Sequence, residues 1–135
     1  NYRTHLEKNS LYNTPPTLAI YFLKLVLEWV ESEGGVEAME KRNNEKAKIL
    51  YDVIDESGGF YIGHARKDSR SNMNVTFTLA DKEWEAEFLK QAREKGFVGL
   101  NGHRSLGGCR ASIYNAVPVS HVEKLAEFMR AFKNR

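Results

Sequence analysis

The chain has 135 residues, of which 41% are hydrophobic and 28% charged, with a formal net charge of +2. This length is one domain's worth of sequence, and the composition excludes a wholly disordered protein. The near-balance of charge argues against a dedicated nucleic-acid binder or a polybasic membrane binder. The single cysteine, Cys109, cannot form an intrachain disulfide, which favours a reducing, cytoplasmic location.

The N-terminal region carries no recognisable targeting signal. Residues 1–10 are polar and are expected to be extended or mobile, and they lack the apolar segment of a secretory signal. Because residue 1 is Asn rather than Met, we expect the chain to be a piece of a longer or processed protein. The most apolar stretch, residues 18–30, would span only about 20 Å as a helix. A bilayer core needs about 30 Å, so no membrane segment is predicted.

Two helices are predicted in the first part of the chain. The first runs from about Pro15 to Glu33, with Thr14 as its N-cap and a proline in its first turn. It is apolar on most sides and therefore needs wide burial. Gly34-Gly35 ends it, and a second helix runs from Val36 to about Glu56. Five residues of that helix recur at helical spacing and are expected to face inward: Val36, Met39, Ala47, Leu50 and Ile54.

Short strands and two more helices follow. Strands are predicted over residues 60–62, 72–79, 97–100 and 110–115, with a polar loop over residues 64–71. Apolar and polar residues alternate over 72–79, as in a half-buried strand. Helices are predicted from Asp81 to about Lys95, and after a capping box at residues 120–123. This order of elements predicts an α+β fold, with a small, mostly antiparallel sheet and helices packed on one face.

The segment from Gly102 to Arg110 is the most informative for chemistry. It places His103, Arg104 and Arg110 among three glycines, whose backbone N–H groups can approach a ligand closely. Arginine binds carboxylate or phosphate through a two-pronged fork. The segment therefore predicts a site for a small molecule with two anionic groups. The alternative is a surface loop whose arginines form ordinary salt bridges.

Other candidate residues are weaker. Asn13 and Thr14, at a helix N-terminus, predict a phosphate site, although plain helix capping explains them as well. The four histidines show no metal-ligand spacing, so no metal is expected. Cys109 is interpreted as a buried structural thiol rather than a nucleophile. The basic cluster at residues 66–70 is interpreted as part of a solvated loop.

Three segments together resemble the phosphoserine aminotransferase family: residues 10–17, 70–75 and 102–116. They occur in the family's order and spacing, and the resemblance covers nearly the whole chain. It matches the C-terminal part of those enzymes, including the small domain of a fold-type I aminotransferase. The sequence departs from the family's usual pattern at Thr76, where proline is usual, and at Cys109, where a larger apolar residue is usual. Neither residue is expected to touch a ligand.

The resemblance implies an activity and a set of roles. Family members depend on pyridoxal 5'-phosphate and transfer an amino group from glutamate to 3-phosphohydroxypyruvate, which gives O-phosphoserine and 2-oxoglutarate in serine biosynthesis. By resemblance, Arg110 holds the substrate α-carboxylate, and His103 and Arg104 receive the substrate phosphate. Asn13 and Thr14 reach the cofactor phosphate of the other subunit of a homodimer.

The resemblance also implies what lies outside this sequence. In the family, the Schiff-base lysine belongs to a large domain upstream, so no catalytic residue is assigned here and the chain alone is expected to be inactive. Residues 1–14 are expected to follow that large domain, and residues 15–135 to form the small domain. Two other possibilities remain open: a stand-alone anion-binding or regulatory module, and an interaction domain that dimerises through its apolar first helix.

Overall fold

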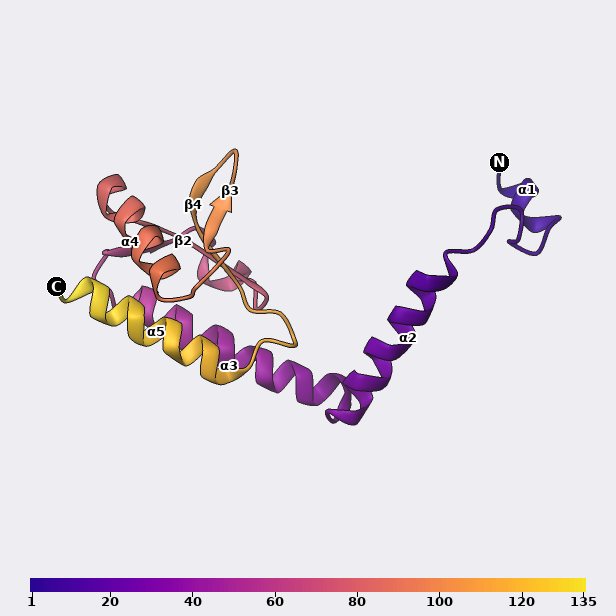
Figure 1. Ribbon diagram of the computed structural model, residues 1–135, viewed down its shortest axis with the longest axis horizontal. Helices are drawn as coiled ribbons and strands as arrows, with labels where there is room; N and C mark the ends of the chain where they lie inside the picture. Colours follow the sequence, from indigo (N-terminus) through magenta and orange to yellow (C-terminus); the bar gives the residue numbers. More distant parts are fainter. The chain divides into compact units, whose positions relative to one another are not determined.

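The computed structural model describes all 135 residues and contains two compact units, residues 1–38 and 39–135. Figure 1 labels most of their helices and strands along the chain. The boundary between the units lies after Ala38. The domain boundary predicted after residue 14 concerns the longer protein and stays a prediction.

The first unit is helical and begins earlier than predicted. Helix α1 spans Tyr2–Leu6, so these residues are helical rather than extended, and the Asn1 side chain caps it by accepting a hydrogen bond from the Arg3 N–H. Helix α2 spans Thr17–Ser32, with Pro16 at the N-cap position and no side-chain cap. The predicted start at Pro15 and the predicted Thr14 cap are therefore wrong. A residue before proline is pushed out of the helical conformation, so Pro15 cannot be helical ahead of Pro16.

Helix α2 exposes its apolar side chains. Its Lys24–Glu28 pair forms the one ion pair along it, at 3.1 Å, and no α2 residue is buried. The wide burial expected for this helix is not found in the chain itself. No helix of the structure is long and apolar enough to cross a membrane. Eight large apolar residues of α2 are between 40% and 68% exposed: Leu18, Ile20, Tyr21, Phe22, Leu23, Leu25, Val26 and Leu27.

The second unit has the predicted α+β architecture. It contains most of α3 (Gly35–Asp55), then β1 (Tyr61–Gly63), the short 3-10 helix η1 (Lys67–Ser69), β2 (Asn74–Leu79), α4 (Lys82–Glu94), β3 (Asn101–His103), β4 (Gly107–Ser112) and α5 (Val119–Lys133). The four strands form one antiparallel sheet in the order β1-β2-β4-β3. Helix α5 lies along α3 in Figure 1.

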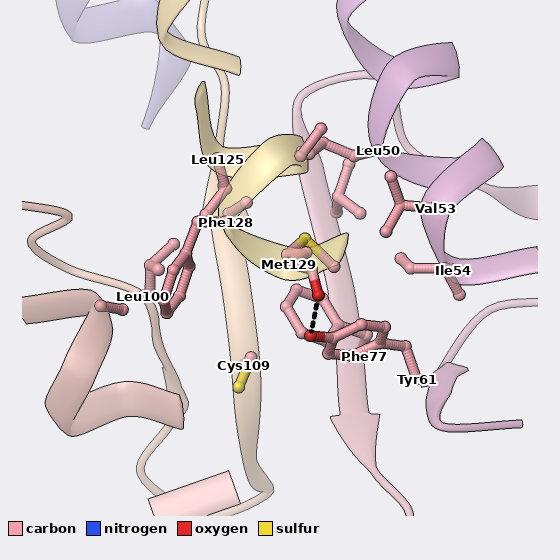
Figure 2. Close-up of a cluster of buried hydrophobic side chains, with 14 of the residues drawn as sticks. Leu50, Val53, Ile54, Tyr61, Phe77, Leu100, Cys109, Leu125, Phe128 and Met129 are labelled. Carbon is pink, nitrogen blue, oxygen red and sulfur yellow. Dashed lines mark hydrogen bonds between the residues drawn. The ribbon is translucent and has the colours of Figure 1, made fainter. Parts of the chain in front are cut away.

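The core lies between the helices and one face of the sheet, as predicted. On β2, Val75, Phe77 and Leu79 are buried while their neighbours are half-buried, which confirms the alternation. Residues of α3, α4 and α5 complete this cluster, part of which is drawn in Figure 2. The Tyr61 hydroxyl donates a 2.8 Å hydrogen bond to the Met129 carbonyl within it. Val36 is the exception among the residues expected inside, since it is 77% exposed.

Two local predictions in the second half are wrong. Residues 97–100 contain no strand; the strands are instead β3 and β4, which pair as a hairpin. The capping box at residues 120–123 is also absent, because α5 begins at Val119 after Pro118. The proline ring fixes the φ of Pro118 at −62°, and a ψ of 148° leaves this residue in an extended conformation. The helix therefore starts at the next residue, Val119. Ser120 is therefore already inside the helix.

The segment after β1 is attached to α3 by an arginine. Arg70 binds Asp55 through two hydrogen bonds, Nη1 to Oδ2 at 3.0 Å and Nη2 to Oδ1 at 2.6 Å. Its guanidinium lies 4.4 Å from the ring centroid of Tyr51, whose hydroxyl donates to the Ser71 carbonyl. The Arg70 side chain is only 14% exposed. Arg70 is thus an anchor, and not the solvated loop residue that the sequence predicted.

The Asp55–Arg70 pair predicts a loss of stability in acid. The hydrogen bonds from Arg70 lower the pKa of Asp55 from 3.8 to about 2. A depressed carboxyl pKa stabilises the fold above pH 3.8, and the benefit is lost as the pH falls through about 2. Because Asp55 is partly exposed, screening limits the effect to about 1 kcal/mol.

Between pH 5 and pH 2, we expect the unfolding free energy of wild type to fall by about 1 kcal/mol more than that of Asp55→Asn. Urea unfolding followed by Trp84 fluorescence, in a Trp29→Phe background, measures the difference. Parallel pH profiles for the two proteins would contradict the assignment.

Candidate functional site

The face of the sheet opposite the helices carries polar side chains, and we call it the open face. On β4, Arg110 and Ser112 alternate with the buried Cys109 and Ala111. On β2, Thr76 lies directly opposite Arg110 in the antiparallel register. Because side chains alternate between the two faces of a strand, Arg110 and Thr76 both belong to the open face.

The β3–β4 hairpin holds the predicted basic residues beside this face. His103 ends β3 and pairs with Gly107, and Arg104 lies in the turn between the strands. A Cβ atom on Gly102 would lie 1.9 Å from the Gly107 carbonyl oxygen, so only glycine lets the two strands pair this closely. Gly107 has a φ of +71°, which lets the chain turn into β4.

A cavity of about 210 Å³ joins the hairpin to the open face of the sheet. His103 and Arg110 both line it, as the two-anion prediction requires. Arg104 is exposed in the neighbouring turn and is not among the lining residues. The remaining lining residues are His64, Thr76, Phe77, Thr78, Gly102, Leu106, Gly107 and Cys109.

Arg110 gives the strongest evidence for a binding site in the cavity, because it is half-buried and has no acidic partner. Its Nε is buried without any hydrogen-bond acceptor. The Nε of Arg70 also lacks an acceptor, but both terminal nitrogens of Arg70 pair with Asp55, whereas Arg110 pairs with no acidic residue of the chain. A buried cation is expensive unless it is paired. An anionic ligand would supply the partner that Arg110 lacks within the chain, which favours the binding prediction over the ordinary salt-bridged loop.

The His103 ring is oriented by its own turn. Its Nδ1 lies 2.7 Å from the Ser105 hydroxyl, and the Ser105 backbone N–H points to the same nitrogen at 3.3 Å. A backbone N–H can only donate, so Nδ1 is an acceptor in this arrangement. The neutral ring then carries its proton on Nε2, which makes Nε2 the hydrogen-bond donor left for a ligand.

Asn13 and Thr14 belong to the first unit, where they precede α2 by three or more residues. Both are exposed. The prediction that they sit directly at a helix N-terminus is wrong, since α2 begins at Thr17. Their amide and hydroxyl groups remain available as hydrogen-bond donors, and their role toward a phosphate stays a prediction.

Cys109 is the buried structural thiol that the sequence predicted. It is 2% exposed, and burial raises its pKa to about 12, which keeps the thiol protonated and unreactive. His, Cys, Asp and Glu residues nowhere form a group that could hold a metal ion.

The sequence missed a buried lysine that supports the site. Lys46, in α3, is completely buried and donates to the carbonyls of Ile113, Tyr114 and Val117 at 3.0, 2.8 and 3.1 Å. Burial lowers its pKa. The three acceptors follow β4, so Lys46 fixes the segment into which the strand of Arg110 runs. Hydrophobic periodicity cannot identify Lys46 as buried, because a lysine in an amphipathic helix is expected to lie on the surface.

Thr76 and His64 were missed for a different reason. The alternation of β2 places Thr76 on the polar face, but only the strand register places it opposite Arg110. Thr76 lines the cavity with Arg110, and the expectation that it touches no ligand group stays a prediction. His64 follows β1, and its backbone N–H donates to the Thr76 carbonyl at 3.2 Å.

Comparison with known proteins places the chain and its fold in one family. The aminotransferase class-V family model matches residues 1–125, and the chain belongs to that family. Among its relatives, phosphoserine aminotransferase of Geobacillus kaustophilus is 67% identical over the whole chain, and that of Bacillus subtilis is 63% identical over 98% of it. The predicted resemblance to phosphoserine aminotransferases is thereby confirmed.

Solved structures agree with the sequence relatives. Phosphoserine aminotransferase from Bacillus circulans subsp. alkalophilus matches 98% of the chain with a TM-score of 0.91 and 55% identity. A pyridoxal-phosphate-bound phosphoserine aminotransferase from Trichomonas vaginalis matches 96% with a TM-score of 0.84 and 38% identity. The chain spans only 37–38% of the length of these relatives. The fold predicted from the resemblance is confirmed.

Proposed function

We propose that this chain is the substrate-anion-binding part of a phosphoserine aminotransferase. The longer enzyme transfers an amino group between glutamate and 3-phosphohydroxypyruvate, giving O-phosphoserine and 2-oxoglutarate. The observation that carries the proposal is the half-buried Arg110, unpaired within the chain and aligned with His103 along one cavity. The identity of 55–67% to several phosphoserine aminotransferases supports it.

Each basic residue has a role suited to its position. Arg110 is fixed in a strand and binds the α-carboxylate, which both substrates share, through its planar fork. His103 and Arg104, at the end of β3 and in its turn, bind the phosphate. Arg104 lies in an exposed turn, so it can approach the phosphate after the substrate has entered.

The cofactor in this proposal is pyridoxal 5'-phosphate, which supplies an electron sink at the substrate's α-carbon when bound. The residues of this chain that fit it are Asn13 and Thr14, whose exposed amide and hydroxyl can donate to a phosphate. No lysine of this chain is assigned to attach the cofactor. Lys46, the buried lysine, already donates to three carbonyls and is not available.

The partners are the remainder of the longer protein and a second subunit in a homodimer. The exposed apolar side chains of α2 support this part of the proposal, because an apolar surface of that extent marks an interaction site. The same surface would serve a dimerisation module without catalysis, which is the alternative function. A cytoplasmic location completes the proposal, supported by the single, buried thiol.

Arg104→Ala in the full-length protein tests the function. We expect kcat/KM for O-phosphoserine with 2-oxoglutarate to fall about 100-fold, because hydrogen bonds between charged groups are lost. The kcat/KM for alanine, an unphosphorylated amino acid without a second anionic group, is expected to change less than about threefold. Steady-state amino-transfer assays with both substrates measure the ratio. Equal losses for both substrates would show that Arg104 does not bind the phosphate. If the folded, cofactor-loaded wild type has no activity, the alternative function remains, a module without catalysis.

A further inference from the structure

Two polar residues beside Arg110 have no role in the proposed function. Thr76 lies directly opposite Arg110 across the β2–β4 pair. His64 continues the β1–β2 pairing by one residue, since its N–H donates to the Thr76 carbonyl. Along this stretch Tyr61 is buried and Ile62 exposed, so the alternation puts His64 on the open face. His64, Thr76 and Arg110 therefore form one row across three strands.

The spacing of this row leaves room for a small anion. Adjacent strands lie about 4.8 Å apart, so the backbones of His64 and Arg110 are roughly 10 Å apart. The residue between them, Thr76, has a short side chain. All three line the same cavity of about 210 Å³. The result is a hollow in which Thr76 lies between two larger nitrogen-bearing side chains, those of His64 and Arg110.

The chemistry of the row suits a carboxylate. A carboxylate has two oxygens with about four acceptor positions, and an arginine fork uses only one edge of it. The imidazole of His64 is exposed, and neither it nor the Thr76 hydroxyl is used in a hydrogen bond within the chain. Both groups can donate to the carboxylate positions that Arg110 leaves open.

We propose that His64 and Thr76 complete the carboxylate site of Arg110, with the histidine ring N–H and the threonine hydroxyl donating to the bound carboxylate. This inference rests on the proposed function, in which Arg110 binds the substrate α-carboxylate. The phosphate site lies on the other side, because His103 is on β3 and β3 flanks β4 opposite to β2. The sheet order thus separates the two anionic groups of the substrate on either side of the strand that carries Arg110.

Two ligands that differ by one group test this assignment. O-phosphoserine has both a carboxylate and a phosphate, whereas O-phosphoethanolamine lacks the carboxylate. Isothermal titration calorimetry on the full-length protein loaded with pyridoxamine 5'-phosphate gives the Kd of each ligand without turnover, because this amine form of the cofactor cannot react with an amino ligand. The variants are His64→Gln and Thr76→Val, with Arg66→Gln as the matched control. Arg66 is exposed in the same segment, pairs with Asp68 and does not line the cavity.

We expect His64→Gln and Thr76→Val each to raise the Kd of O-phosphoserine about tenfold, as the loss of one hydrogen bond to a charged group predicts. The Kd of O-phosphoethanolamine is expected to stay within about twofold, and Arg66→Gln to change neither ligand. Equal weakening of both ligands would place His64 at the phosphate and overturn the proposal, as would an unchanged Kd for O-phosphoserine.

The Arg110→Ala variant separates failure of this proposal from failure of the function. One outcome would refute only the present inference: wild type and the His64 and Thr76 variants bind O-phosphoserine equally well, whereas Arg110→Ala does not bind it. If wild type does not bind O-phosphoserine at all, the proposed function fails, and this inference with it. Circular dichroism and the thermal midpoint confirm that each variant is folded.

Discussion

Replacing Arg110 with alanine in the full-length protein is expected to lower kcat/KM for O-phosphoserine by about 100- to 1,000-fold. The change removes both hydrogen bonds of an arginine fork together with its charge, a loss of about 3–4 kcal/mol. Glutamate is expected to lose a similar factor, because its α-carboxylate would occupy the same position. Steady-state kinetics with both substrates measure the effect.

Arg70→Ala is the control for this variant, and the two are expected to give opposite results. Arg70 binds Asp55 and touches Tyr51, so its loss should lower the thermal midpoint while leaving the KM of both substrates unchanged. Arg110 has no partner within the chain, so its loss should leave the thermal midpoint unchanged or raise it. A large drop in midpoint for Arg110→Ala with an unchanged KM would show that its role is structural.

Replacing Lys46 with methionine is expected to cost about 3 kcal/mol of local stability. Methionine keeps the length of the side chain but leaves the carbonyls of Ile113, Tyr114 and Val117 without their donor. Backbone amides of β4 and of the start of α5 should then exchange with solvent about 100-fold faster. Hydrogen–deuterium exchange of the full-length protein, read by mass spectrometry, measures this locally.

Lys48→Met is the matched control, two residues along the same helix. Lys48 is exposed and pairs only with Asp52, one helical turn away. Exposed pairs of this kind contribute about 0.5 kcal/mol or less, so exchange in β4 should not change. Similar acceleration in the two variants would contradict the role of Lys46.

The sequence was most informative where burial and local chemistry act together. The alternation of residues 72–79 identified β2 and its inner face, and Asp81 was correctly expected to begin α4, which it caps. Apolar spacing likewise identified the inner face of α3, apart from the exposed Val36. In these elements the same residues that favour the local conformation also supply the core, so pattern and structure coincide.

Helix ends and strand register were less predictable. Pro15-Pro16 and Pro118 displaced the starts of α2 and α5 from the positions that their polar residues suggested, because proline restricts the backbone around it. His103 and Arg110 were identified from their residue types and the glycines around them. His64 and Thr76 were not, because only the pairing of β1, β2 and β4 brings them beside Arg110.

The close approach at Gly102 also determines how this hairpin can change over evolution. Any side chain there would collide with the Gly107 carbonyl, so the position admits no substitution that preserves the pairing. The turn residues Arg104, Ser105 and Leu106 are exposed and lie outside the strand pairing, so the backbone sets no such steric limit on them. Under the proposed function, substitutions there would alter the contacts to the anionic group, directly at Arg104 and through His103 at Ser105, while Arg110 and its strand stay in place.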